Sequence, residues 1–368
     1  MGGGRRESSE IYQKEIYQVI DNLIKCKKSV DMREFWIDRW KGLLILLVVL
    51  GHVVGAGGNL AQDETSTMLL GIRNFIYLFH MPAFFILAGL CFNTTTIHNE
   101  HFRNLVVKRS KRLLLPYLVF GVFSWVVYDV MYNDFGSFWL QMLRMVIAYD
   151  DFRCNSVLWF LPTMFLVVIT SFFTFKFIRS RSGLFSIFLM FFLLFFILRY
   201  NHINHLPFKL FSVLQYYIFF MLGVGLKRFR AIKVDVGIAS IVVVSFIGCV
   251  IFCRYTNFNT RPFGGYLLWI VKGFLGAVLT ALIIKGLPER GFKWLEWVGG
   301  MSMGIMLIHK FPLVAIQEHI PIVRRMFCDD VSTALIGSII VFLSTLVCSI
   351  LGTIILRKIF PWSIGEAR

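Results

Sequence analysis

Charged side chains are scarce in this sequence. Asp, Glu, Lys and Arg make up 16% of its 368 residues, whereas a typical soluble domain carries about 25%. Hydrophobic residues reach 57%, Phe alone occurs 39 times, and the mean hydropathy is +0.71. This composition excludes a disordered chain and a coiled coil. A water-soluble core cannot cover so much apolar surface, so we predict an integral membrane protein.

Cysteine and metal-ligand motifs of the kind that stabilise small domains are also absent from the sequence. The seven cysteines are scattered, and neither C-x-x-C nor H-E-x-x-H occurs, so a disulfide-stabilised secreted module is excluded and no metal site is predicted. Long polar segments are absent too, since the longest predicted outer loop covers only residues 134–156. Any chemistry is therefore expected within a helix bundle or at its rim.

Long apolar runs dominate what is present. A membrane-spanning helix needs about 20 mostly apolar residues. Ten segments come close to this length: 42–58, 70–92, 113–133, 157–178, 184–199, 211–226, 236–253, 264–285, 299–317 and 333–356. We predict an all-α bundle of about ten transmembrane helices in a domain over residues 32–357, with a short tail over 358–368.

The basic residues are distributed unevenly between the two sides of this predicted bundle. Of the 38 Lys and Arg residues, 27 fall on the side of the two termini and 8 on the other. Positive charge is enriched on the cytoplasmic side of membrane proteins, so both termini are predicted to be cytoplasmic. The net charge of +17 is thus explained by topology and by attraction to anionic membrane lipids, and no nucleic-acid partner is expected.

The first 31 residues allow two interpretations. Apolar residues between Tyr12 and Ile24 recur at helical spacing, which indicates an amphipathic helix on the inner membrane surface. Alternatively, Met32 is the true start, because the run that follows it reads naturally as an N-terminus. In either case the segment is too polar for a signal peptide.

Ionisable residues inside apolar segments are costly, so each marks a candidate functional site. Lys41 and His52 are eleven residues apart in the first span. Eleven steps of about 100° bring them within about 20° of one helix face, roughly 16 Å apart along the axis. A lone buried His is more often a packing residue, but its alignment with a cation favours a functional role here.

The second span carries a similar arrangement. Arg73 and His80 are seven residues apart and share a helix face. Pro82 is expected to free a backbone carbonyl and kink the helix. Ala88 and Gly89 would permit close helix packing. Packing alone is an equally good explanation of Pro82 and Gly89.

Two further groups of polar residues lie near the predicted membrane edges. Arg109 and Arg112 belong to the basic run 108–112. This run is either a cytoplasmic anchor or a binding site for the phosphates of a nucleotide-like donor. In the ninth span, Ser302 and His309 are seven residues apart and again share a face.

Taken in order, these blocks resemble the acyltransferase 3 superfamily of integral-membrane acyltransferases. Within it, the chain looks most like the group described as fucose 4-O-acetylase-like, which modifies cell-surface sugars. The resemblance covers about residues 31–357 and includes the hallmark of a basic residue, ten residues and a His. The blocks are Asp38…Lys41-Gly42…Gly51-His52, Phe79-His80-Met81-Pro82-Ala83-Phe84-Phe85…Gly89, Arg109…Arg112…Pro116-Tyr117, Leu158-Trp159-Phe160-Leu161-Pro162 and Gly299…Ser302…His309.

This chain departs from the family pattern at three positions. Ala88, Met306 and Lys310 stand where members usually have Ser, Tyr and a neutral residue. The fold expected from the resemblance does not depend on these positions. They bear on how the substrates are placed.

The resemblance implies an O-acyltransferase. Its donor would be an acyl-CoA, with acetyl-CoA favoured, and its acceptor a hydroxyl of a cell-surface or lipid-linked glycan. An alcohol needs a base to remove its proton, and His is the side chain best matched to that task near neutral pH. We therefore assign His52 as general base or transient acyl carrier, with His80 as the second catalytic candidate.

The remaining candidates are assigned to the donor or to the acceptor. The CoA phosphates are expected to bind Lys41, Arg39, Arg109 and Arg112. Acceptor placement or oxyanion stabilisation is expected from Arg73, Ser302 and His309.

Other functions compete with this one. An exporter or secondary transporter would also place charges inside spans, and a non-enzymatic scaffold is the least favoured alternative. Trp159 and Tyr216 are predicted to belong to an interfacial belt or to packing rather than to a sugar platform. The expected location is the bacterial inner membrane.

Overall fold

The computed structural model describes the chain outside the predicted leader, from Phe35 onward. The described residues are 35–132, 138–148, 155–203, 206–227, 236–255, 262–288 and 291–366. The predicted leader and the alternative start at Met32 lie outside them. Every regular element within these ranges is a helix, which confirms the all-α prediction.

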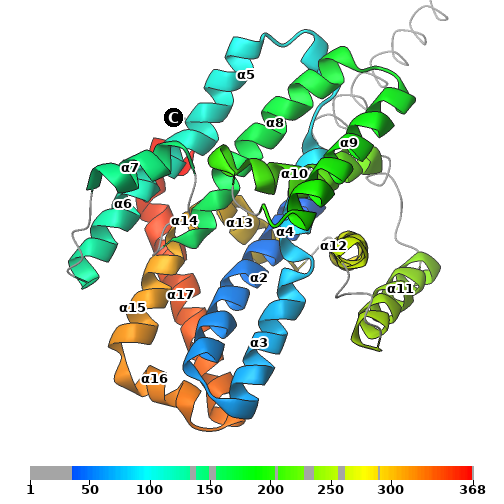
Figure 1. The fold of residues 1–368 in the computed structure, drawn as a ribbon. Coiled ribbons are helices and arrows are strands. Elements are labelled where there is room, and N and C mark those ends of the chain that lie inside the picture. Colours follow the sequence, from blue (N-terminus) through cyan, green and yellow to red (C-terminus); the bar gives the residue numbers. More distant parts are fainter. Residues whose placement is uncertain are drawn as a thin grey trace, which may run out of the picture.

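Figure 1 shows the helices as a bundle, labelled in chain order. The α-helices are α2 (Phe35–Leu60), α3 (Asp63–Tyr77), α4 (His80–Cys91), α5 (Phe102–Arg109), α6 (Leu115–Tyr132), α7 (Phe138–Val146), α8 (Phe160–Phe177), α9 (Arg181–Tyr200), α10 (Leu210–Gly225), α11 (Val236–Tyr255), α12 (Pro262–Gly286), α13 (Lys293–Gly300), α14 (Ser302–Ile308), α15 (Lys310–His319), α16 (Pro321–Cys328) and α17 (Val331–Ile359). Short helical turns are η1 (Thr96–His98), η2 (Ser110–Leu114), η3 (Ser156–Trp159), η4 (Pro207–Lys209) and η7 (Pro361–Ile364).

Eight of the described helical segments are long and apolar enough to cross a membrane. A ninth candidate is the pair Lys293–Gly300 and Ser302–Gln317, which is bent by 59°. The tenth predicted window coincides with α11, whose shorter apolar part is Gly237–Ile251. Each of the ten windows therefore coincides with helix in the described residues, and the chain is a multi-pass membrane protein; eight windows meet the length and hydropathy requirement.

The second and ninth spans are interrupted. In the second, α3 ends at Tyr77 and α4 begins at His80, with a turn between them. Pro82 lacks the N–H that would bond the carbonyl four residues earlier, so the helix loosens on the N-terminal side of the proline. The predicted distortion is confirmed, and it takes the form of a break at residues 78–79.

Helix α2 lies at the centre of the bundle and packs against α3, α13 and α17 (Figure 1). Its contact with α13 brings backbone against backbone. A Cβ added at Gly42 would strike the carbonyl oxygen of Leu295, and one added at Gly299 would strike the carbonyl oxygen of Asp38. This close approach fixes the N-terminal half of α2, which carries the basic end of the predicted site.

Helices α4 and α10 cross in the same manner. A Cβ at Gly89 would meet the carbonyl oxygen of Phe220, and one at Gly223 would meet that of Ile86. The prediction that Gly89 permits close helix packing is confirmed. Because the two glycines are reciprocal, the crossing holds α4 and its His80 in a defined position against α10.

Candidate active site

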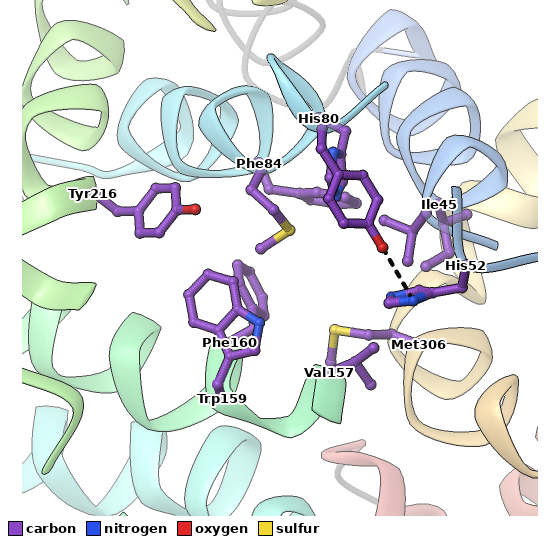
Figure 2. Close-up of a pocket in the computed structure, with 12 residues that line it drawn as sticks. Ile45, His52, His80, Phe84, Val157, Trp159, Phe160, Tyr216 and Met306 are labelled. Carbon is purple, nitrogen blue, oxygen red and sulfur yellow. Dashed lines mark hydrogen bonds between the residues drawn. The ribbon is translucent and has the colours of Figure 1, made fainter. Parts of the chain in front are cut away.

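A cavity of about 170 Å³ lies inside the bundle, where α2, α4, α10 and α14 converge (Figure 2). Most of its lining is apolar or aromatic, with a few polar groups, as in many small-molecule sites. The lining residues are Ile45, Val48, His52, Tyr77, His80, Met81, Phe84, Val157, Trp159, Phe160, Tyr216 and Met306. Two of the predicted catalytic candidates, His52 and His80, therefore share one cavity.

One face of α2 connects this cavity to the rim of the bundle. Ile45, Val48 and His52 line the cavity at helical spacing, and Lys41 lies one turn before Ile45 on the same face. Lys41 Nζ is 3.0 Å from Asp38 Oδ1, and its side chain is 35% exposed. The face thus carries an accessible cation at one end and a half-buried imidazole at the other.

His52 is held by a residue of the neighbouring helix. Its Nδ1 lies 3.1 Å from the phenol oxygen of Tyr77 (Figure 2). The ring of His309 lies 5.3 Å from that of His52, centroid to centroid. Three ionisable side chains from α2, α3 and the α14–α15 junction therefore meet at one place.

His80 and His309 share a second feature. His80 Nδ1 lies 2.9 Å from the carbonyl oxygen of Ile76. His309 Nδ1 lies 3.0 and 2.9 Å from those of Ile305 and Met306. A carbonyl only accepts hydrogen bonds, so each Nδ1 carries the proton and each Nε2 is left with a lone pair. The Nε2 of His309 is buried and has no hydrogen-bond partner in the described part of the chain.

Arg73 and Ser302 lie outside the cavity lining. The Arg73 guanidinium carbon sits 5.0 Å from the centroid of the Tyr77 ring, so Arg73 reaches the site through Tyr77. Ser302 begins α14, immediately after the bend of the ninth span. Its predicted role in binding the acceptor or the oxyanion stays a prediction.

Arg39 has protein partners at the rim. Its guanidinium donates to Glu296 Oε1 at 2.7 Å and to the carbonyl oxygen of Pro288 at 2.9 Å. The side chain is only 5% exposed. Arg39 therefore ties α2 to the segment that leads into α13, and its predicted contact with the donor stays a prediction.

Arg109 and Arg112 lie on a different element from Lys41. Arg109 directly precedes η2 and Arg112 lies within it; η2 is a π-helical turn that packs against α8 and the C-terminal turn η7. Arg109 Nε is buried without a hydrogen-bond partner among the described residues. The C-terminal segment links this region to the α13 rim, because Arg357 bonds both Glu366 and the carbonyl oxygen of Gly300.

The sequence analysis did not assign three of the aromatic cavity residues to the site: Tyr77, Trp159 and Tyr216. The rings of Trp159 and Tyr216 lie 5.3 Å apart at 30°, and Tyr216 also stacks on Phe85 at 4.6 Å. Both side chains line the cavity and pack against the core, so of the two predicted places, belt or packing, the structure shows packing. Trp159 lies in a block that resembles the family, and this was the available signal.

Metal ligation has little support among the residues described. No three His, Cys, Asp or Glu side chains there come together as metal ligands would. The polar groups of the cavity are imidazoles, phenols and an indole N–H, which suit proton transfer and hydrogen bonding.

Comparison with known proteins places this chain in a family. The model described as Acyltransferase domain matches residues 34–358. The nodulation protein NolL of Mesorhizobium japonicum is 30% identical over 102 residues, which is 28% of this chain and 26% of that protein. NolL of Sinorhizobium fredii is 32% identical over 93 residues, 25% of each chain.

These relatives match only a limited part of the molecule. The matches span about a quarter of the length of either nodulation protein. No solved structure matches. The family model, in contrast, covers both interrupted spans and the whole cavity. The chain therefore belongs to the acyltransferase family defined by this domain, as its sequence blocks predict.

Proposed function

We propose that this protein is a membrane-bound O-acyltransferase that moves an acyl group, acetyl from acetyl-CoA in the simplest case, to a hydroxyl of a cell-surface or lipid-linked carbohydrate. One observation carries the proposal above all. Within an acyltransferase domain, a half-buried imidazole faces a cavity inside the bundle on the same helix face that begins with an accessible lysine.

His52 would perform the proton transfer. Its Nε2 takes the proton of the acceptor hydroxyl while the oxygen attacks the thioester carbonyl. The carbon–sulfur bond then breaks, and the imidazolium returns the proton to the departing CoA thiolate. In the alternative sequence, His52 first accepts the acyl group itself and passes it to the hydroxyl. Both routes give an ester and free CoA.

The donor would enter along the face of α2. Lys41 at the rim would bind CoA phosphate, and the roughly 16 Å from Lys41 to His52 along the helix suits an extended pantetheine arm. Arg109 and Arg112 are the next cations proposed for the phosphates, and they adjoin the C-terminal turn on the same side as the α13 rim. Arg39 would support the site by holding Glu296.

The acceptor would occupy the aromatic part of the cavity. Trp159 and Tyr216 line it with aromatic surface and one polar hydrogen each, which suits a sugar with apolar C–H faces and hydroxyl edges. His80 Nε2 would orient an acceptor hydroxyl. Arg73, Ser302 and His309 remain the more distant candidates for placing the acceptor or stabilising the oxyanion.

We propose the bacterial inner membrane as the location, with both chain termini in the cytoplasm. The excess of Lys and Arg on that side supports this orientation. The donor rim, formed by the start of α2 and by α13, would then face the cytoplasmic pool of acyl-CoA.

The test compares the wild type with His52→Ala at matched membrane levels in a strain that lacks the native gene. Ester-linked acetyl on the purified surface polysaccharide is measured by NMR, before and after mild base. We expect acetyl with the wild type and none with His52→Ala. His319→Ala is the matched control, because His319 is exposed at the end of α15.

Two outcomes would contradict the proposal. Full acetylation by His52→Ala would remove the assigned base. Absence of acetyl with the wild type, together with a changed amount of exported polymer, would favour the exporter over the acyltransferase.

A further inference from the structure

Helices α2 and α3 face each other through two matched pairs of residues. A Cβ added at Gly51 would lie 2.8 Å from Tyr77 Cε1, and one added at Gly55 would lie 2.8 Å from Arg73 Cδ. Gly51 and Gly55 are four residues apart on α2, and Arg73 and Tyr77 are four residues apart on α3. The two glycines therefore form a shallow surface, here called the bed, against which the Tyr and Arg side chains of α3 lie. This bed lies directly beside His52.

The bed fixes the ring of Tyr77 from two sides. Gly51 lets the ring lie against the α2 backbone, and the Arg73 guanidinium lies 5.0 Å from the ring centroid. A cation at this distance is attracted to the face of an aromatic ring. The phenol oxygen is thereby held 3.1 Å from His52 Nδ1.

An imidazole acts as a base through the ring nitrogen that carries a lone pair, so the tautomer of His52 decides which nitrogen can take the proton of the acceptor. A neutral imidazole carries one proton on either Nδ1 or Nε2, and the hydrogen bond made by one nitrogen decides which nitrogen keeps the lone pair. The other close ring, that of His309, lies at a centroid distance of 5.3 Å and an interplanar angle of 39°. Tyr77 is thus the described side chain that hydrogen-bonds the His52 ring.

We propose that Tyr77, braced by Arg73 in the bed formed by Gly51 and Gly55, is a positioning residue for His52. Its phenol oxygen accepts the Nδ1–H of His52, so that Nε2 keeps its lone pair for the acceptor hydroxyl. This inference rests on the proposed function, because it requires His52 to act as the base.

The informative substitution is Tyr77→Phe. Phe keeps the ring against Gly51 and under the Arg73 guanidinium, and it removes only the oxygen that bonds His52. We expect the maximal rate to fall by about 10- to 100-fold, part of what a general base contributes. The apparent KM for acetyl-CoA should stay within about twofold, because a loss confined to proton transfer leaves donor binding intact.

The assay uses membrane vesicles that carry the full-length protein and the natural surface glycan of the host. Radiolabelled acetyl-CoA is the probe, and base-labile label on the glycan is the product. Initial rates are normalised to the amount of protein that elutes as a single species in mild detergent. Tyr217→Phe is the matched control, since Tyr217 is a buried tyrosine whose hydroxyl bonds Thr174 instead of a histidine.

A second substitution tests the bed itself. Gly55→Ala would push Arg73 away from its place beside Tyr77, and we expect it to lower the maximal rate in the same direction as Tyr77→Phe. Combining the two changes should cost little more than Tyr77→Phe alone, because both act through the same hydrogen bond.

The results separate this inference from the proposed function. A wild-type maximal rate for Tyr77→Phe, with His52→Ala inactive, would overturn the role of Tyr77 and leave the proposed function standing. A raised KM with an unchanged maximal rate would also overturn it, because Tyr77 would then bind substrate. Full activity of His52→Ala would overturn both.

Discussion

Lys41 and Arg39 stand two residues apart on α2, and their charges are compensated differently. Lys41 is 35% exposed, and its partner among the described residues is the Asp38 carboxylate one turn away, so its ammonium group is accessible to an incoming phosphate. We expect Lys41→Ala to raise the apparent KM for acetyl-CoA about tenfold, the loss of one charge-assisted hydrogen bond. The maximal rate should change little. Kinetics at varied acetyl-CoA provide the measurement, and an unchanged KM would contradict the donor site.

Arg39 should behave differently, because its guanidinium is enclosed by protein. Arg39→Ala leaves the Glu296 carboxylate, 19% exposed, without the cation that it meets at 2.7 Å. Removing one partner of a buried ion pair costs about 3–5 kcal/mol. We expect a marked loss of thermal stability in detergent and a nearly unchanged KM in whatever protein remains folded.

The double variant Arg39→Met with Glu296→Leu provides the check on Arg39. It should recover much of the lost stability, because neither charge is then left unpaired. A tenfold rise in KM for Arg39→Ala without destabilisation would instead place Arg39 in the donor site.

Sequence spacing predicts the relative position of two site residues when both of them lie on one helix. The 3.6-residue period predicted that Lys41 and His52 share a face, and the cavity lining between them, Ile45 and Val48, follows that face. Tyr77 escaped prediction for a physical reason. Its importance comes from a contact across two helices, and only the packing of α3 on α2 brings its oxygen to His52.

At the scale of whole elements, the junction of α2 and α13 makes the sharpest prediction. Gly299 and Gly300 are adjacent, yet a Cβ at Gly299 would strike the Asp38 carbonyl, whereas one at Gly300 would meet nothing within 4 Å. We expect Gly299→Ala to destabilise the protein by about 2 kcal/mol or more through overpacking. Gly300→Ala should be close to neutral. Thermal melting of the two purified variants measures the difference, and equal melting temperatures would contradict the packing described.

The helices were more predictable than their interruptions. Apolar runs locate helices because lipid requires internal backbone hydrogen bonding, and every predicted window coincides with a helix. The breaks after Tyr77, at Met301 and at His309 depend on which individual carbonyls lose their partners. Pro82 and Pro312 each remove one N–H, but a hydropathy window averages over such single bonds.

For the whole molecule, the distribution of Lys and Arg predicts the orientation in the membrane. If the start of α2 is cytoplasmic, Gln62 after α2 lies outside and Asn99 between α4 and α5 lies inside. Both side chains are exposed. We expect a membrane-impermeant maleimide to label Gln62→Cys in intact spheroplasts and Asn99→Cys only after permeabilisation, in a background without the native cysteines. The reverse pattern would place the donor rim on the wrong side for cytoplasmic acyl-CoA.

The two histidines at the interrupted spans also affect how genetic results on this protein are interpreted. His80 and His309 each donate from Nδ1–H to a carbonyl oxygen of the preceding turn, in addition to the backbone N–H that this carbonyl already accepts. An alanine at either place removes this structural hydrogen bond together with any chemistry, so loss of activity alone identifies neither role. Amide isosteres separate them: Asn presents its N–H₂ near the position of Nδ1, and Gln presents it near that of Nε2. At each of these two positions, a purely structural role requires that Asn be tolerated, whereas participation in the reaction requires that Asn fail although the protein folds.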